Sequence, residues 1–497
     1  MFLIIFLKNY YKIYLNNNYP SLRMNNDNYD FVYTKHIETL YGPKRNYIFD
    51  TDLIKHNILP HIYNITDRKD LTDLETYSID PDGCEDADDA FSIYFENNKL
   101  YLAIHIADPT EFINLDSELW TSIEKTVITK YPSNTKPIHL IPDVIMQISS
   151  LMDNEFGDTK NAITILTEIN TSNYLPCHNI QLLFSRIRLK KENSLSYYEA
   201  SCNINNNDCL GFGLKISKSL QQKRMNRTIG VKLNELNSSN IKYHNHIPYL
   251  YIDSQQEKDM KQMIAEFAIF ANSFVGEYLK INFNQHGIFR TCNASDIIHN
   301  EYYKNLSGND LLHEIITNGI HADYLNTVAS HDLVGSDEYT HFTSPIRRAS
   351  DCICHYLLKY LHLKKLNIDL KVPFQLDKLQ ELSEKCVIES KKIKRIQYKD
   401  TKFRLIQIMN LLLYENEYIQ LSFYITSYKE PFLNVIINKI NEHHVYLSYS
   451  LKINKVTNYI HNPNVIHNIN ILFVNIPGKF DEGSIPELDD YIFSMFL

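Results

Sequence analysis

The sequence predicts a mixed α/β domain followed by a small all-β region. Apolar and polar residues alternate over Lys99–Ile106 and Ala162–Ile169, which indicates strands. Glu257–Leu279 has the apolar spacing of a helix with one buried face. After about Glu415 only short alternating runs occur, which is typical of a small barrel or a meander. We therefore expect helices and strands in one large domain and strands alone near the end.

Further elements follow from the same periodicities. Phe91–Phe95 and Lys99–Ile106 predict a hairpin that turns across Glu96, Asn97 and Asn98. The remaining expected elements are a strand over Ile180–Phe184, a helix over Ala349–Leu361 and a long helix over Leu376–Leu413.

Length and composition narrow the class of protein. The chain has 497 residues, of which 44% are hydrophobic and 22% charged, as in ordinary globular proteins. Its net charge of −9 argues against a generally basic nucleic-acid coat, although a local binding channel is compatible with it. The 8 cysteines include no CxxC pair or zinc-finger spacing, so we expect reduced thiols, an intracellular protein and no disulfide-linked partner.

The N-terminus contains an apolar run over Phe2–Leu7. This run is far shorter than the roughly 20 residues that span a membrane, and it lacks a signal-peptide cleavage site. No other stretch predicts a membrane span, so no membrane partner is expected. Met24 is an alternative start, residues 1–30 are expected to be disordered or adventitious, and 31–75 form a short N-terminal segment.

Six acidic residues crowd into the segment from Asp80 to Asp89. Like charges at this spacing repel one another, so a cluster that stays ionised needs a cation. Carboxylate oxygens suit hard divalent ions, and Mg²⁺ is the usual choice in phosphate chemistry. The segment therefore predicts a metal-dependent site for phosphoryl transfer or phosphodiester cleavage.

Two simpler interpretations compete with the metal site. A solvated acidic loop is the commoner role of an Asp-rich stretch, but strand patterns on both sides confine this one. An EF-hand calcium loop needs Gly at its sixth and Glu at its twelfth position. Counted from Asp80, Gly83 comes too early and Phe91 takes the place of the glutamate, so the calcium loop is excluded.

A second conspicuous segment runs from Tyr339 to Leu358. Pro345 suits the first position of a helix that Thr343 or Ser344 would cap. Arg347 and Arg348 would then lie in the first helical turn, where positive charge is unfavourable unless it has an anionic partner such as phosphate. Pairing of one arginine with the nearby Asp351 is the alternative.

Basic residues dominate part of the long predicted helix, where Asp400 is the single acid. They are Lys391, Lys392, Lys394, Arg395, Lys399, Lys402 and Arg404. A solvated helix face and a wall that contacts phosphates are equally compatible with this run.

Both segments resemble signatures of the RNB family, the exoribonucleases of the ribonuclease II and ribonuclease R type. The first signature is similar to the run from Ser78 through Asp80, Asp86, Asp88 and Asp89 to Ala90, and the second to His341–Asp351. Further pieces similar to the family occur between them in the same order. They are Thr129–Pro142, Ser185–Ala200, Glu266–Asn272 and Gly287–Arg290.

The resemblance implies an α/β catalytic domain over 76–412 with a funnel-shaped RNA channel, and a small β domain over 413–497, related to OB or S1-like barrels. It implies 3′→5′ hydrolysis of single-stranded RNA to 5′-nucleoside monophosphates by a two-metal mechanism using Mg²⁺, with Mn²⁺ as an alternative. It also implies a monomer acting in the cytoplasm, or alternatively the nucleus.

Individual roles are also implied by the resemblance. The metal ligands would be Asp80, Asp86, Asp88 and Asp89, which leaves Asp82 and Glu85 as bystanders. The catalytic residues would be Asp88 and Arg347, and the RNA-binding residues Tyr131, Arg347 and Arg348. The resemblance also favours the interpretation that the basic helix contacts phosphates as part of the channel wall.

The sequence departs from the family pattern at Cys84, at Ala349 and at Pro132, which directly follows Tyr131. Only about 75 residues precede the acidic signature, too few for the two cold-shock domains of bacterial members. One alternative is therefore an inactive RNA-binding or scaffold protein on the same fold. A metal phosphoesterase acting on small substrates is another.

Overall fold

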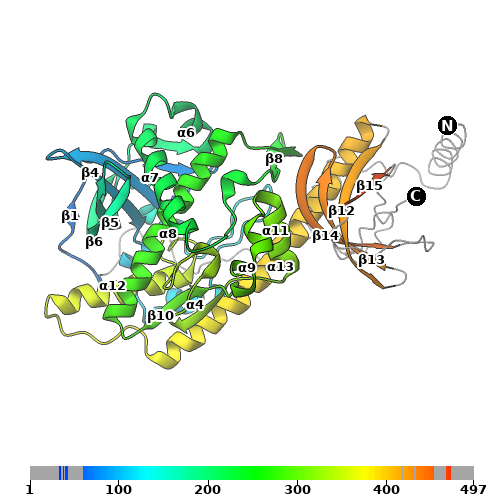
Figure 1. The fold of residues 1–497 in the computed structure, drawn as a ribbon. Coiled ribbons are helices and arrows are strands. Elements are labelled where there is room, and N and C mark those ends of the chain that lie inside the picture. The colour runs from blue at the N-terminus through cyan, green and yellow to red at the C-terminus, as the bar shows by residue number, and fades with distance from the viewer. Residues whose placement is uncertain are drawn as a thin grey trace, which may run out of the picture.

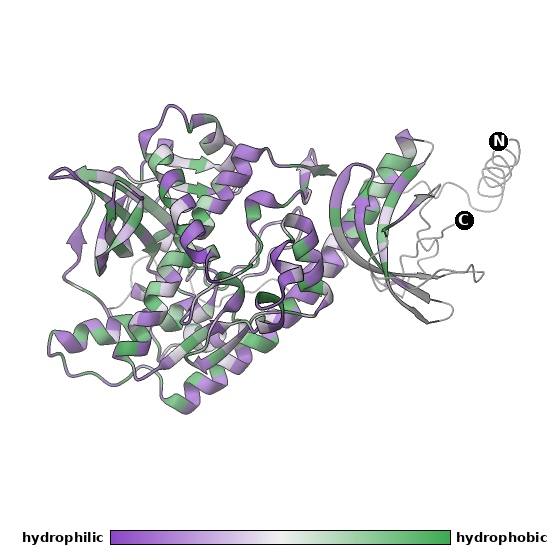
Figure 2. Ribbon diagram, in the orientation of Figure 1, coloured by the Kyte–Doolittle hydropathy of each residue, from purple (hydrophilic) through white to green (hydrophobic). Residues whose placement is uncertain are grey.

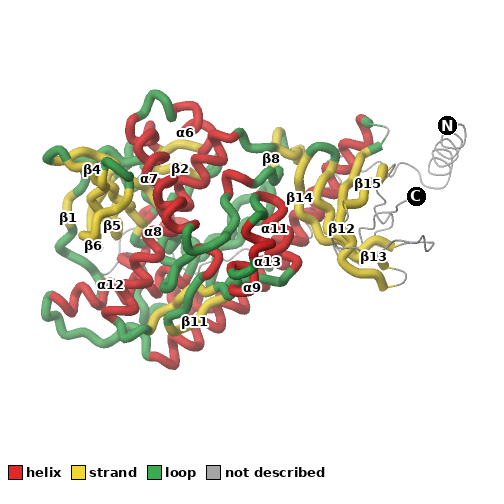
Figure 3. The backbone as a smooth tube through the Cα atoms, in the orientation of Figure 1, coloured by secondary structure: helices red, strands yellow, loops and turns green. Residues whose placement is uncertain are grey.

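The computed structural model describes residues 33–34, 37, 40–42, 60–416, 418–429, 432–452 and 466–471. A mixed α/β region fills one end of the molecule and a separate β-sheet the other, with the long helix α13 (Leu376–Glu415) reaching between them (Figures 1 and 3). The predicted fold class, α/β with a small all-β part near the C-terminus, is confirmed. Residues 1–30, expected to lack structure, lie outside the described residues.

The main sheet has five strands in the order β1-β6-β5-β4-β3. Its antiparallel neighbours are β3 with β4, β4 with β5, and β5 with β6, whereas β1 pairs with β6 in parallel. The strands are β1 (Lys69–Asp70), β3 (Asp89–Glu96), β4 (Lys99–Ala107), β5 (Thr159–Asn170) and β6 (Leu175–Arg188).

Three two-stranded sheets accompany it. They pair β2 (Ser78–Asp80) with β7 (Ser194–Ser196), β8 (Asn240–His244) with β9 (Ile247–Tyr251), and β10 (His286–Thr291) with β11 (Asp323–Thr327).

The predicted hairpin is present, with Glu96 opposite Lys99. Its two-residue turn uses Asn97 and Asn98 at φ angles of 50° and 62°, the left-handed region that asparagine tolerates well. The alternating pattern sets the register, because Ile104 and Ile106 on β4 lie opposite Ile165 and Ile163 on β5. One face of the sheet is therefore apolar.

Helices cover this apolar face. The Phe267 ring lies edge-on to Phe91 of β3 with centroids 5.4 Å apart, and His362 lies 4.8 Å from Phe184 of β6. The helices of the α/β region are α4 (Glu118–Thr126), α5 (Asp143–Ser149), α6 (Tyr197–Asn203), α7 (Asp208–Met225), α8 (Gln255–Asn282), α9 (Ser295–Ile298), α10 (Glu301–Lys304), α11 (Gly308–Thr317) and α12 (Ala349–Lys365).

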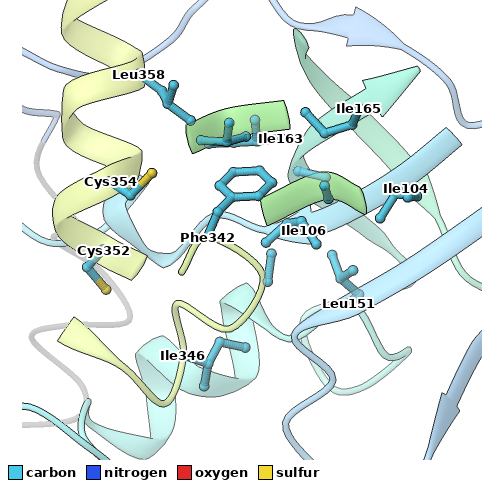
Figure 4. Packing of buried hydrophobic residues seen from close by; sticks show 14 of the residues in the cluster. Ile104, Ile106, Leu151, Ile163, Ile165, Phe342, Ile346, Cys352, Cys354 and Leu358 are labelled. Carbon is cyan, nitrogen blue, oxygen red and sulfur yellow. The ribbon is translucent and has the colours of Figure 1, made fainter. Parts of the chain in front are cut away.

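Phe342 joins the sheet to α12 in the core. Its ring is fully buried among Ile106, Ile163, Cys354 and their neighbours (Figure 4). The segment before it lies so close to α8 that a Cβ on Gly276 would stand 2.9 Å from the Glu338 carbonyl oxygen. Close approach therefore requires glycine here. The same packing holds the second signature against the main sheet and α8.

The C-terminal sheet has the strand order β14-β13-β12-β15, and all its pairs are antiparallel. Its strands are β12 (Ile419–Lys429), β13 (Phe432–Ile440), β14 (His443–Lys452) and β15 (Ile466–Ile471). Within the described residues β14 and β15 do not pair, so closure into a barrel stays a prediction. Phe423 of β12 shares a buried cluster with Phe403, Ile406 and Met409 of α13.

Hydrophilic and hydrophobic residues are interspersed along α13 (Figure 2). In the part of the chain that the structure describes, no helix combines the length and the apolar character that crossing a bilayer requires.

Candidate active site

The acidic loop joins two strands. Asp80 ends β2 and Asp89 begins β3, and Gly83 turns the loop between them at a φ of +76°. The loop is held from outside by two backbone hydrogen bonds: Ala107 N donates to Asp88 O at 2.8 Å and Leu151 N to Ala87 O at 3.1 Å. The predicted ligands are thus confined at one end of the main sheet.

Asp88 faces the second signature. Its carboxylate is only 4% exposed and accepts hydrogen bonds from Ile346 N at 2.8 Å and from Arg347 Nε at 3.0 Å. Burial raises the pKa of Asp88 to about 8, although Arg347 and the Ile346 N–H oppose the shift. Two residues predicted to be catalytic, far apart in sequence, are therefore in direct contact.

Asp80 and Asp89 are two half-buried acids at the ends of the strands that flank the loop. Burial raises the pKa of each to about 7, and the charge of Asp80 raises that of Asp89 further. The Asp80 Oδ2 atom is buried without a hydrogen-bond partner in the described structure. A buried carboxylate oxygen in this state is unfavourable unless a cation meets it.

Asp86 lies at the more open side of the loop. Its Oδ2 accepts a hydrogen bond from the Tyr131 hydroxyl at 3.3 Å and lies 3.9 Å from His139 Nδ1. Burial and the Asp86 charge raise the pKa of Tyr131, whose ring remains 38% exposed. The predicted RNA-binding tyrosine is thus placed beside a predicted metal ligand.

The two arginines have different surroundings. The Arg347 side chain is 44% exposed and donates from its second terminal nitrogen to Ser344 Oγ at 2.8 Å. Burial opposes its charge, but Asp88 and the weaker contributions of Tyr131, Asp351 and Asp89 together outweigh burial and raise the pKa of the guanidinium. Arg348 pairs with Asp351 at 2.9 Å, the alternative that the sequence left open for one arginine.

The helix predicted over Ala349–Leu361 begins at Ala349 as expected, but the separate prediction that Pro345 takes its first position is wrong. Pro345 lies in a turn, and α12 begins at Ala349 with Arg348 as its N-cap and no capping side chain. Arg348 has extended angles (φ −136°, ψ 127°) and bridges to Ile128, while Ala349 N donates to Val127 O at 2.8 Å. Pairing with this distant segment keeps the arginines out of the helix.

Tyr197, which sequence reasoning missed, also borders the acids. It opens α6, and burial together with the charges of Asp89 and Asp80 raises its pKa. A signal did exist, because Ser196 and Glu199 form a capping box that fixes this residue at the helix start. The expected bystanders lie outside: Glu85 is exposed, and Asp82 reaches Lys242 at 3.3 Å.

The basic run on α13 divides into two kinds of residue. Lys391 pairs with Asp323 at 2.9 Å and keeps a half-exposed side chain. Arg404, in contrast, is 1% exposed and donates to Ser133 Oγ at 3.0 Å and to Gln407 Oε1 at 2.8 Å. Arg404 is thus an internal structural residue, and a phosphate-contacting wall can include only other members of the run.

The carboxylates of the acidic loop are suitable ligands for a divalent metal ion, although their side chains do not stand together as a complete ligand set. Among the residues described, no three His, Cys, Asp or Glu side chains stand together as metal ligands. The Asp88 oxygens contact Ile346 N and Arg347. Even so, three buried or half-buried carboxylates with raised pKa values and the unpartnered Asp80 Oδ2 are the hard oxygen donors that Mg²⁺ or Mn²⁺ takes.

Comparison with known proteins identifies the family. The model of the RNB domain matches residues 68–364, more than half of the chain, so the chain belongs to the RNB family. The human exosome complex exonuclease RRP44 is 26% identical over 344 residues, covering 59% of this chain and 34% of that protein. Exoribonuclease 2 of Psychromonas ingrahamii is 26% identical over 367 residues, covering 64% of this chain and 55% of that protein.

Solved structures share the fold. RNase R of Mycoplasma genitalium, solved with ribose-methylated single-stranded RNA, superposes with a TM-score of 0.67 at 17% identity, covering 86% of this chain and 70% of that one. Yeast Ssd1, described as a pseudonuclease, superposes with a TM-score of 0.59 at 15% identity. The match covers 78% of this chain and 50% of the Ssd1 chain. The chain spans about a third to a half of the length of the curated relatives above.

Proposed function

We propose that this protein is a metal-dependent 3′→5′ exoribonuclease that hydrolyses single-stranded RNA to 5′-nucleoside monophosphates in the cytoplasm. The observation that carries the proposal is the contact between buried Asp88 and Arg347 in the same loop as half-buried Asp80 and Asp89, within a chain of the RNB family. The names of RRP44 and exoribonuclease 2 support the nuclease class.

Each residue has a role in this scheme. Asp80, Asp86, Asp88 and Asp89 would hold Mg²⁺ or Mn²⁺, which supplies water activation and stabilises the leaving oxygen. Arg347, half-exposed and oriented by Asp88 and Ser344, would contact the scissile phosphate. Tyr131 would stack on the terminal base, a contact that any base can make. Arg348, already paired with Asp351, would reach RNA only while keeping that ion pair.

The test is an assay with 5′-labelled and 3′-labelled single-stranded RNA, with products resolved on a gel. We expect mononucleotide release from the 3′ end in Mg²⁺ and none after chelation with EDTA. Mn²⁺ is expected to restore activity. Release that is unaffected by EDTA, or fragments from internal cleavage, would contradict the proposal.

An inactive RNA-binding protein on the same fold is the second candidate. The pseudonuclease Ssd1 among the structural neighbours favours it, as does the lack of an assembled metal-ligand set in the described residues. This candidate predicts that RNA binds equally well with and without Mg²⁺ and that no nucleotide is released. The same assay, combined with a filter-binding measurement, separates the two.

A further inference from the structure

The loop that carries Tyr131 is fixed on both sides. Lys130 and Ile138 exchange backbone hydrogen bonds of 3.0 and 2.8 Å, which close the loop. On one side of Tyr131, Lys130 Nζ donates to the carbonyl oxygen of Tyr41. On the other side, Ser133 N donates to Asp400 Oδ2 at 2.9 Å, and the Ser133 hydroxyl donates to Asp400 Oδ1. The orientation of Tyr131 thus depends on residues remote from it in sequence.

Asp400 is the centre of these contacts. It is 3% exposed and accepts further hydrogen bonds from the hydroxyls of Tyr33 at 2.9 Å and Tyr41 at 2.7 Å. A buried carboxylate needs hydrogen bonds to compensate its lost hydration, and these donors supply them. Arg404, one helical turn further on, packs against the same group, with its guanidinium 3.7 Å from the centre of the Tyr33 ring and its Nε donating to Ser133 Oγ.

We call Tyr33, Tyr41, Ser133 and Asp400 the tyrosine latch. It connects three parts of the chain: the N-terminal segment, the Tyr131 loop and α13. Tyr33 also belongs to the buried cluster that α13 shares with the C-terminal sheet. The latch therefore ties the packing of Tyr33 against α13 and the C-terminal sheet to a loop whose tyrosine contacts Asp86 at 3.3 Å.

We propose that the tyrosine latch is a positioning device that holds Tyr131 beside the acidic loop, with Asp400 as its principal positioning residue. The proposal rests on the proposed exoribonuclease function, because it assigns to the N-terminal segment control over where the terminal nucleotide stops. None of the latch residues needs to touch RNA. Their effect on the reaction is transmitted through the Tyr131 loop alone.

The first test compares Tyr41→Phe and Asp400→Asn with wild type on labelled single-stranded RNA. Loss of one hydroxyl contact with Asp400 is expected to lower kcat about fivefold to tenfold and to lengthen the shortest product, with the KM for long RNA changed less than about twofold. Tyr63→Phe is the matched control, because Tyr63 is a buried tyrosine that donates to Lys371 O at 2.8 Å away from the loop. An equal effect of Tyr63→Phe would overturn the proposal.

The second test repeats Tyr41→Phe in a Tyr131→Ala background. If the latch acts through Tyr131, the second substitution is expected to change kcat and product length by less than about twofold. A purely structural role would instead leave the full effect of Tyr41→Phe in place, and that result would refute the assignment. The milder Ser133→Ala variant serves if Asp400→Asn does not fold.

The third test does not depend on activity. Amide hydrogen exchange over residues 128–138 is expected to quicken at least about threefold in Tyr41→Phe, while exchange over 161–167 in β5 stays unchanged. Unchanged exchange in the loop would overturn the latch even in an active enzyme. Conversely, the proposed function would be refuted if the wild type released no nucleotide. Faster exchange in Tyr41→Phe would still support the latch in that case.

Discussion

The acidic loop and the turn over residues 345–347, here called the arginine turn, meet at Asp88 but are held in different ways. The acidic loop is confined by the strands on either side of it, β2 and β3, and by the backbone bonds to Ala107 and Leu151. The arginine turn depends on partners from elsewhere, because Thr129 N donates to Arg347 O at 2.9 Å and Asp88 accepts from Arg347 Nε. Substitutions in the loop should therefore act on chemistry, whereas those in the turn should act on both chemistry and folding.

Asp88→Asn is expected to have the largest effect. Asparagine keeps an oxygen for the Ile346 N–H but loses the charge that pairs with Arg347 and that a metal requires. We expect nucleotide release to fall by about 10²–10³-fold while RNA binding persists. Single-turnover assays with a filter-binding control measure both quantities. Wild-type activity in this variant would mean that the acidic loop is not the centre of the chemistry.

Substitution of the paired arginines separates chemistry from folding within the turn. Arg347→Lys is expected to lower kcat about 10²-fold at an unchanged melting temperature, because its side chain is half-exposed at the site. Arg348→Lys is expected to reduce the free energy of unfolding by about 2 kcal/mol, because it weakens a mostly buried pair with Asp351. Both variants are compared by kinetics and urea unfolding. If both lowered kcat and the free energy of unfolding equally, Arg347 and Arg348 would not have separate roles in chemistry and folding.

Local and distant interactions explain which features the sequence could predict. The β3–β4 hairpin, the acidic cluster and α8 follow from alternation, composition and helical spacing within short windows. The helix α12 begins at Ala349 as predicted, but Pro345 does not start it, because Arg348 pairs with Ile128, a contact that helix-start rules do not include. The latch was missed for the same reason, since Tyr41 and Asp400 are 359 residues apart. The capping box indicated that Tyr197 starts a helix, but its place beside the acids depends on the distant pairing of Asp80 with Ser196.

A buried histidine in β4, next to the strand that follows the acidic loop, predicts that the stability of the protein depends on pH. His105 of β4 is fully buried between Ser92 and Thr164, and burial lowers its pKa to about 3. Above pH 6.5 both folded and unfolded states are neutral there, so stability is unaffected. Between pH 6.5 and about 3 only the unfolded state takes up the proton, which costs up to about 1.4 kcal/mol per pH unit.

Urea unfolding of wild type and His105→Asn at pH 7 and pH 5.5 measures this contribution. Other groups titrate in the same range, so the contribution of His105 is the difference between the stability losses of the two proteins. We expect the wild type to lose more stability on acidification than the variant. Identical losses would show that His105 is not held neutral by the fold.

The smallest effects are expected from Asp82→Asn and Glu85→Gln, which share the loop and the chemistry of Asp88 but are exposed. Asp82 only pairs at the surface with Lys242, and exposed pairs contribute little. We expect nucleotide release within about twofold of wild type, at both low and high salt. These variants are the matched controls for Asp88→Asn, since all three replace a carboxyl group by an amide in the same short segment. A large loss in either would mean that the total charge of the loop, rather than the position of its buried carboxylates, governs the reaction.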